Sequence, residues 1–108
     1  MKSTILITTT ERVAGKEVDE TLGLVKGATI QTRHIGGHIL AGLMTIIGGE
    51  VRGYVKAVAA AREEATARML KEAEEMGANA VLCTRYSTSQ IMSGGAEILV
   101  YGTAVKLK

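Results

Sequence analysis

The stretch that decides the fold is GGEVRGYVKAVAAAREEATARMLKEAEEMGANA, residues 48–80. Apolar side chains recur in it at steps of three or four residues, which predicts one amphipathic helix over about residues 51–76. The stripe consists of Val58, Ala61, Ala65, Met69, Ala73 and Met76. Its alanines allow another backbone to approach closely. Gly77 stands where a left-handed C-terminal cap is expected.

The helix also carries a charged face. Glu64 and Arg68 are four residues apart, as are Arg68 and Glu72, so both pairs are spaced for ion pairing. Each such pair contributes a few tenths of a kcal/mol.

A β-hairpin is predicted after the helix. Residues 80–92 and 97–108 read as strands, joined by the four-residue loop SGGA at 93–96. One face of the second strand carries Leu99, Tyr101, Thr103, Val105 and Leu107, and the other carries Ile98, Val100 and Ala104. Because both faces are apolar, we expect one to cover the helix and the other to meet a neighbour.

Two further strands and a second helix are predicted before residue 48. Residues 4–10 are short and β-branched, and residues 21–32 are strand-like but interrupted by Gly23 and Gly27. Glycines inside a strand mark bulges or close approach, so we expect a bent or edge strand there. Residues 37–47 read as a short helix ended by Gly48 and Gly49. The predicted fold class is α+β, an antiparallel sheet packed on one long and one short helix in the order β-β-α-α-β-β.

The composition points to self-association. The 108 residues suit a single domain, 1–108, and 46% are hydrophobic while only 3% are aromatic, with no Phe, Trp or Pro. A core built from aliphatic side chains and alanine is thin, because large rings supply much of the buried area in small domains. We therefore expect the chain to bury surface against copies of itself.

Charge and cysteine content exclude several classes of protein. The net charge of +2 comes from 13 basic and 11 acidic residues without a Lys/Arg block, which argues against nucleic-acid binding. No apolar run reaches the roughly 18 residues of a membrane span. The single cysteine, Cys83, permits no internal disulfide and fits a reducing compartment, so a cytoplasmic location is expected.

A set of motifs spread over nearly the whole chain resembles the small bacterial and archaeal YbjQ-like proteins. These motifs are Thr8-Thr9-Thr10, Gly15, residues 25–27, Gly48-Gly49, Tyr54, Ala61-Arg62, Gly77-Ala78-Asn79-Ala80 and Tyr101-Gly102-Thr103-Ala104-Val105. That family is a domain of unknown function often labelled "putative heavy-metal-binding". The resemblance implies an α+β fold with an antiparallel sheet on helices, and a ring of five subunits.

The chain departs from the family pattern on one surface. Family members typically have an Arg-Asp pair where this chain has Gly37-His38, a basic residue at Met44 and a polar residue at Val55. On a helix, positions 37, 41 and 44 share one face. The small or apolar residues Gly37, Ala41, Met44, Val55 and Ala59, together with His38, therefore predict an interface. It would join rings to each other or to a second protein component, and either engineering of an assembly or natural divergence could have produced it.

Metal binding is the alternative function. His34 and His38 are four residues apart, which places two imidazoles on one helical face, and Cys83 is a third candidate ligand. Gly36 and Gly37 lie between the histidines and weaken a helix there. The competing interpretation is two exposed histidines and a buried small thiol.

A phosphate-binding loop is not supported. Gly48, Gly49 and Gly53 precede or open the long helix, but no Walker-type Lys-Ser/Thr follows, so a tight turn explains them better. Arg52 and Arg62 are candidates for holding a small anion in a ring lumen.

No residue set indicates catalysis. Cys83 is predicted in mid-strand, without a cationic helix start nearby to activate its thiol. We expect Tyr54 to seat the helix start and Arg62 to satisfy backbone or interface carboxylates. Arg85 is interpreted either as a charge on the sheet face or as an intersubunit partner. The sequence thus predicts a non-enzymatic homo-oligomeric domain without a cofactor, with metal or small-ligand binding as the alternative.

Overall fold

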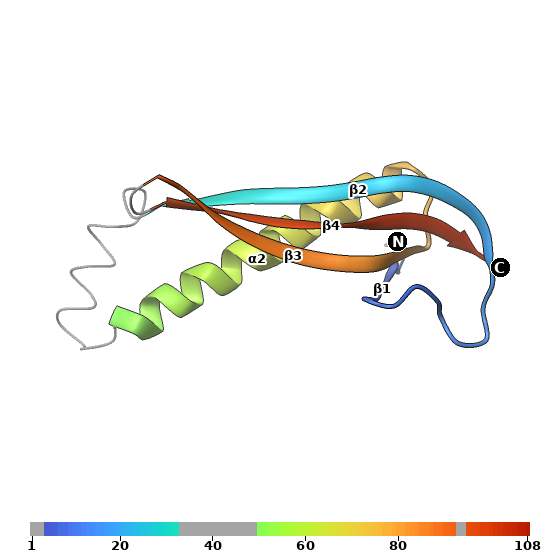
Figure 1. The fold of residues 1–108 in the computed structure, drawn as a ribbon, viewed down its shortest axis with the longest axis horizontal. Coiled ribbons are helices and arrows are strands. Elements are labelled where there is room, and N and C mark those ends of the chain that lie inside the picture. The colour runs from blue at the N-terminus through green and yellow to red at the C-terminus, as the bar shows by residue number, and fades with distance from the viewer. Residues whose placement is uncertain (1–3, 33–49, 93–94) are drawn as a thin grey trace.

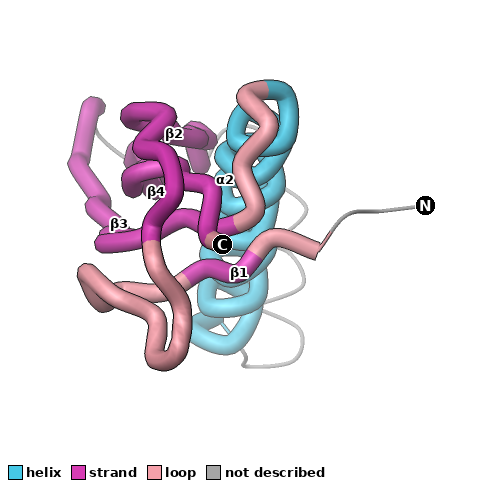
Figure 2. The backbone as a smooth tube through the Cα atoms, turned by 90° about the vertical axis from the view of Figure 1, so that its right-hand side faces the viewer, coloured by secondary structure: helices cyan, strands magenta, loops and turns pink. Residues whose placement is uncertain are grey.

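The computed structural model describes residues 4–32, 50–92 and 95–108. The elements follow the chain as β1 (Leu6–Ile7), β2 (Val18–Thr32), α2 (Glu50–Glu75), β3 (Ala80–Met92) and β4 (Gly95–Leu107). The helix crosses one face of the sheet diagonally (Figure 1). Viewed after a 90° turn, helix and sheet form two layers (Figure 2). The predicted α+β class is confirmed.

The sheet is mixed, with strand order β1-β3-β4-β2. β4 pairs antiparallel with both β2 and β3, which confirms the predicted hairpin. β1 pairs parallel with β3, so the prediction of a purely antiparallel sheet is wrong at this strand. A parallel pair needs a long crossover, which β2 and α2 supply here. Strand direction at this edge depends on that tertiary path.

The glycines of β2 have the roles expected of them. Register shifts lie between Val18 and Glu20 and between Thr21 and Gly23, and β2 is an edge strand. A Cβ on Gly27 would overlap the carbonyl oxygen of Ala65 and lie 2.6 Å from the amide nitrogen of Met69. The backbone of α2 therefore rests directly on the backbone of β2.

The predicted helix stripe forms the core. Ala61, Ala65, Met69 and Ala73 are buried against a cluster that includes Val25, Val81, Ile98, Val100 and Ala104. Val58 is half-buried and packs on this cluster, whereas Met76 lies beyond the helix end and is exposed. The small alanines bring α2 close enough for the contact at Gly27.

The helix ends as predicted. Gly77 has a φ of +85°, its N–H donates to the carbonyl oxygen of Glu74, and the N–H of Ala78 donates to that of Ala73, both at 3.0 Å. These two bonds form a Schellman motif, which satisfies carbonyls that the helix leaves unpaired.

The two faces of β4 separate as expected. Ile98, Val100 and Ala104 pack under α2, while Val105 joins Ala80 and Leu82 in a second cluster on the opposite side. We call that opposite side the outer face. Val13, from the loop between β1 and β2, and Leu107 pack on this second cluster, so the outer face is covered at one end only.

The short helix predicted over residues 37–47 lies outside the described residues. In the described ranges α2 is the one helix. Within the described residues, no helix combines the length and the apolar character that a membrane span needs.

Candidate interaction surface

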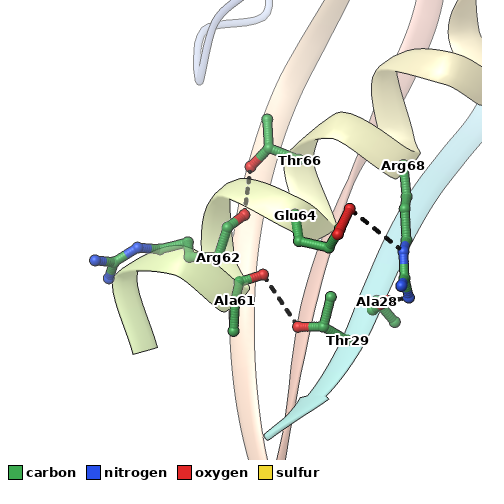
Figure 3. A network of polar contacts seen from close by, with 7 residues as sticks. All are labelled: Ala28, Thr29, Ala61, Arg62, Glu64, Thr66 and Arg68. Atoms are coloured by element: carbon green, nitrogen blue, oxygen red, sulfur yellow. Dashed lines mark hydrogen bonds and ion pairs between the residues drawn. The ribbon is translucent and has the colours of Figure 1, made fainter. Parts of the chain in front are cut away.

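Two side chains of α2 form hydrogen bonds with backbone groups on the outer edge of β2. The Lys26 N–H donates to Glu72 Oε1 at 2.9 Å, and Arg68 Nη1 donates to the carbonyl oxygen of Ala28 at 2.7 Å. Nearby, Thr29 Oγ1 donates to the carbonyl oxygen of Ala61 at 3.1 Å (Figure 3). At Lys26 and Ala28 this edge is therefore capped from within the subunit.

Of the two ion pairs predicted on the helix, one forms and the other does not. Arg68 Nε lies 3.9 Å from Glu64 Oε2, which confirms that pair (Figure 3). The pair between Arg68 and Glu72 does not form, because Glu72 accepts the Lys26 amide. Sequence spacing identified these charges but not their role as caps. The feature that could have indicated this role is that these charged residues flank the buried alanine stripe.

The hydrogen bonds at the edge of β2 show in which direction the backbone N–H and C=O groups point across the sheet. In an antiparallel ladder, the N–H and C=O of one residue point to the same side, and successive residues alternate. The backbone N–H of Lys26 points away from β4, toward Glu72. The backbone groups of its register partner Tyr101 therefore point away from β2, toward β3. There Tyr101 lies opposite Arg85, so these two residues form a hydrogen-bonded pair. It follows that Tyr86 and Thr88 direct their N–H and C=O groups away from β4, toward the far edge of β3.

The first part of that far edge is occupied. Thr8 donates its N–H to Val81 and accepts the N–H of Thr84, both at 3.0 Å. The N–H of Cys83 donates to the carbonyl oxygen of Thr10 at 3.1 Å. Beyond Thr84 the described chain places no strand beside β3, and residues 85–91 are all exposed. We call residues 85–89 the open edge.

Cys83 lies in a β-bulge. The register of β3 skips two residues between Leu82 and Arg85, and Cys83 has a φ of +54°. A left-handed conformation is costly for a non-glycine residue, and bulges accommodate it. The thiol is half-buried, with its sulfur 3.8 Å from the carbonyl oxygen of Thr10, so it is more exposed than the interpretation as a buried small thiol expected.

The bulge is supported from both sides. A Cβ on Gly102 would lie 2.6 Å from Val81 Cγ1 and 3.0 Å from the carbonyl oxygen of Leu82, so only glycine fits beneath the bulge. Arg85 Nη1 donates to the carbonyl oxygens of Thr9 and Thr84, both at 3.0 Å. Arg85 thus fastens the loop after β1, a role that the sequence did not indicate.

The outer face carries exposed apolar side chains beyond the second cluster. Leu24 is 64% exposed, Ile30 is 56% exposed and Tyr101 is 38% exposed. The register places Lys26 opposite Tyr101, Ala28 opposite Leu99 and Ile30 opposite Glu97, so these apolar side chains share one surface across β2 and β4 with two charged ones. Within the described residues no second layer covers it.

The candidate metal ligands do not form a described site. His34 and His38 lie outside the described residues. In residues 4–32, 50–92 and 95–108 no group of three or more His, Cys, Asp or Glu side chains is placed to hold a metal. The nearest polar contact of the Cys83 sulfur is a backbone carbonyl, a weak match for a metal that prefers thiolate and imidazole. Among the described residues, no second metal ligand is therefore placed beside Cys83.

Most of the predicted interface also lies outside the described residues. This applies to Gly37, His38, Ala41 and Met44, and to the motif glycines Gly48 and Gly49. Tyr54, Val55 and Ala59 belong to α2, and Ala59 is half-buried.

Two motif residues have defined positions. Asn79 holds the end of β4: its Nδ2 donates to the carbonyl oxygen of Leu107 at 3.0 Å, and the Leu107 N–H donates to its Oδ1 at 2.7 Å. Arg62 is exposed, and its guanidinium makes no hydrogen bond or ion pair with the described residues. Its predicted role toward backbone groups of the same subunit is therefore not seen here.

Together these features define an α+β domain in which one helix covers a four-stranded mixed sheet and caps one of its edges. The chain belongs to the YbjQ-like family: a family model described as "Putative heavy-metal-binding" matches residues 5–108. The resemblance inferred from the motifs is thus confirmed.

Similar proteins span the whole domain. A UPF0145 protein of Archaeoglobus fulgidus is 52% identical and covers 100% of both chains. Another, of Methanosarcina acetivorans, is 50% identical over 95% of this chain and 97% of its own. A crystal structure of a protein of unknown function from Pediococcus pentosaceus has a TM-score of 0.63 at 15% identity, covering 96% of this chain and 98% of that one. This last likeness supports the fold alone.

Proposed function

We propose that this protein is a non-enzymatic domain whose function is to form a homo-oligomer, a closed ring of five subunits as the family resemblance implies. The observation that carries the proposal is the outer face, where Leu24, Ile30 and Tyr101 remain exposed on the side of the sheet that α2 does not cover.

The arrangement of these side chains matters more than their number. Single exposed apolar residues are common on protein surfaces, whereas a contiguous apolar patch marks a contact site. Here Leu24, Ala28 and Ile30 share one face of β2, next to Leu99 and Tyr101 of β4, and one lysine, Lys26, lies between Leu24 and Ala28 on that face. Covering the exposed part of one such aliphatic side chain contributes about 1–2 kcal/mol, so a few of them support a stable contact.

Ring closure constrains the contact. A ring of five requires a heterologous interface, in which one surface of a subunit meets a different surface of the next. The subunit offers distinct surfaces for this purpose, since α2 lies on one face of its sheet (Figure 2) and the described residues cover the outer face at one end only.

Native mass spectrometry and light scattering test the proposal. The wild-type chain is expected at five times the subunit mass at micromolar concentration. Leu24→Lys places a charge in the outer face, and because Leu24 is 64% exposed the subunit itself should still fold. Each lost contact of about 1.4 kcal/mol weakens association about tenfold. Ala14→Lys, at an exposed position in the loop before β2, is the matched control and should leave the mass unchanged. A stable wild-type monomer would contradict the proposal.

A second candidate function is metal binding by His34, His38 and Cys83, which the family description favours. Calorimetry with zinc, nickel and copper, comparing wild type with His34→Ala and Cys83→Ser, tests it. Binding no tighter than about millimolar would remove this candidate, because functional sites are far tighter.

A further inference from the structure

We propose that the open edge of β3, residues 85–89, pairs with a strand of a second copy of this chain through the backbone groups of Tyr86 and Thr88. This inference rests on the proposed assembly and names the contact that makes it.

The two edges of the sheet are treated differently by the fold. On β2, Glu72 and Arg68 occupy the outward amide of Lys26 and carbonyl of Ala28. On β3, the segment around β1 occupies the outward groups only as far as Thr84. The N–H and C=O groups of Tyr86 and Thr88 have no such partner in the described chain. A subunit that caps one edge and leaves a neighbouring run of backbone groups open is suited to strand addition.

The open edge lacks the devices that normally prevent strand addition. Exposed edges are usually blunted by lysine, proline, inward charges or a bulge within the edge. From Tyr86 to Ser89 the sequence is YSTS, with no charge and no proline. The bulge at Cys83 precedes Tyr86, and a second register shift, between Gln90 and Met92, lies beyond Ser89. The guanidinium of Arg85 is engaged with Thr9 and Thr84. Residues 85–89 extend for roughly 16 Å, within the range of an ordinary strand.

Charge and continuity favour a second copy as the partner. Because the segment from Tyr86 to Ser89 is uncharged, two copies can approach it without like-charge repulsion. Ser87 lies opposite Leu99 and Arg85 opposite Tyr101, so a strand added here extends the same sheet whose outer face carries the exposed apolar side chains. On the other side of the sheet, Tyr86 is held by its hydroxyl, 3.0 Å from Thr66 Oγ1, which keeps its ring over α2. One neighbour can therefore cover the edge and continue over the outer face.

Residue-resolved hydrogen exchange on the wild-type chain tests the inference. It is measured at protein concentrations above and below the dissociation constant of the assembly. Arg85 and Ser87 donate toward β4 and should be protected in both states. The amides of Tyr86 and Thr88 should be slowed at least about tenfold in the assembly only. If native mass spectrometry shows an assembly in which these two amides exchange freely, the edge contact is wrong while the assembly stands. A monomer at all concentrations overturns both, and protection that persists in the dissociated subunit shows that the chain covers its own edge, which also overturns the inference.

A pair of variants at one position gives an independent test. Thr88→Pro removes the outward N–H at a position where an edge strand tolerates proline, and should reduce the assembly to smaller species with an unchanged circular dichroism spectrum. Thr88→Val keeps the N–H and should assemble like wild type. Equal assembly of both variants would contradict strand addition. Should Thr88→Pro fail to fold, the hydrogen-exchange measurement decides alone.

Discussion

The guanidinium of Arg68 donates a 2.7 Å hydrogen bond to the carbonyl oxygen of Ala28. This contact joins the exposed flank of α2 to the outer edge of β2, forty residues away in sequence. Together with Glu72 and Lys26 it places a complementary pair of charges over adjacent backbone groups of the strand. A helix that packs on the face of a sheet thereby also closes its edge.

Arg68→Ala should destabilise the subunit and uncap β2. A hydrogen bond to a charged group contributes about 1.5–3 kcal/mol, and solvent exposure at this site reduces the expected loss to about 1 kcal/mol. Thermal unfolding should shift down by roughly 4–8 °C, measured at one fixed protein concentration because association changes the midpoint. Lys71→Ala, an exposed change on the same helix, is the control. Equal midpoints for the two variants would show that the cap contributes nothing.

Gly27→Ala should be severely destabilising because a methyl group there overlaps the backbone of α2. Moving a helix off a sheet disrupts the core, so we expect a loss of about 3 kcal/mol or more. Gly15→Ala is the comparison, since Gly15 has a φ of +74° but open space around its Cβ. It should cost only about 1–2 kcal/mol of backbone strain. Chemical denaturation of both variants measures the difference, and a Gly27→Ala variant as stable as wild type would exclude the close contact.

Asn79→Ala should loosen the end of β4. The substitution removes two hydrogen bonds to Leu107 and leaves that residue's backbone groups to water, at a cost of about 1–2 kcal/mol. Asn79→Asp keeps the acceptor for the Leu107 amide and loses only the donor, so it should fall between alanine and wild type. Hydrogen exchange at the Leu107 amide should rise in the order wild type, aspartate, alanine. The same rate in all three would argue against this role.

Substitutions at Cys83 should follow backbone conformation rather than thiol chemistry. At a φ of +54°, glycine is tolerated and a β-branched residue is strained. We expect Cys83→Gly and Cys83→Ser to unfold close to wild type, and Cys83→Val to lose about 2 kcal/mol or more. If valine is as stable as serine in urea unfolding, the bulge does not have this conformation.

Local patterns in the sequence predicted much of the secondary structure. The long helix, its buried stripe and its cap at Gly77 follow from periodicity and from the conformational freedom of glycine, which act over a few residues. The hairpin strands and the two faces of β4 follow from alternation for the same reason. The family resemblance was likewise carried by short motifs at fixed spacing.

Long-range relationships required the tertiary structure. The sequence showed Arg68 and Glu72 at the spacing of a helix ion pair. In the folded chain Glu72 Oε1 instead accepts a hydrogen bond from the backbone amide of Lys26, 46 residues away, at 2.9 Å. The parallel direction of β1, the left-handed bulge at Cys83 and the alternation that turns Tyr86 and Thr88 outward depend on how the chain returns to pair with itself. Which segments form helix or strand, and which of their sides are apolar, followed from the amino-acid order alone, since those properties are local. Only the folded chain decided which edge is closed and which is open, because an edge exists only once strands from distant parts of the chain have paired.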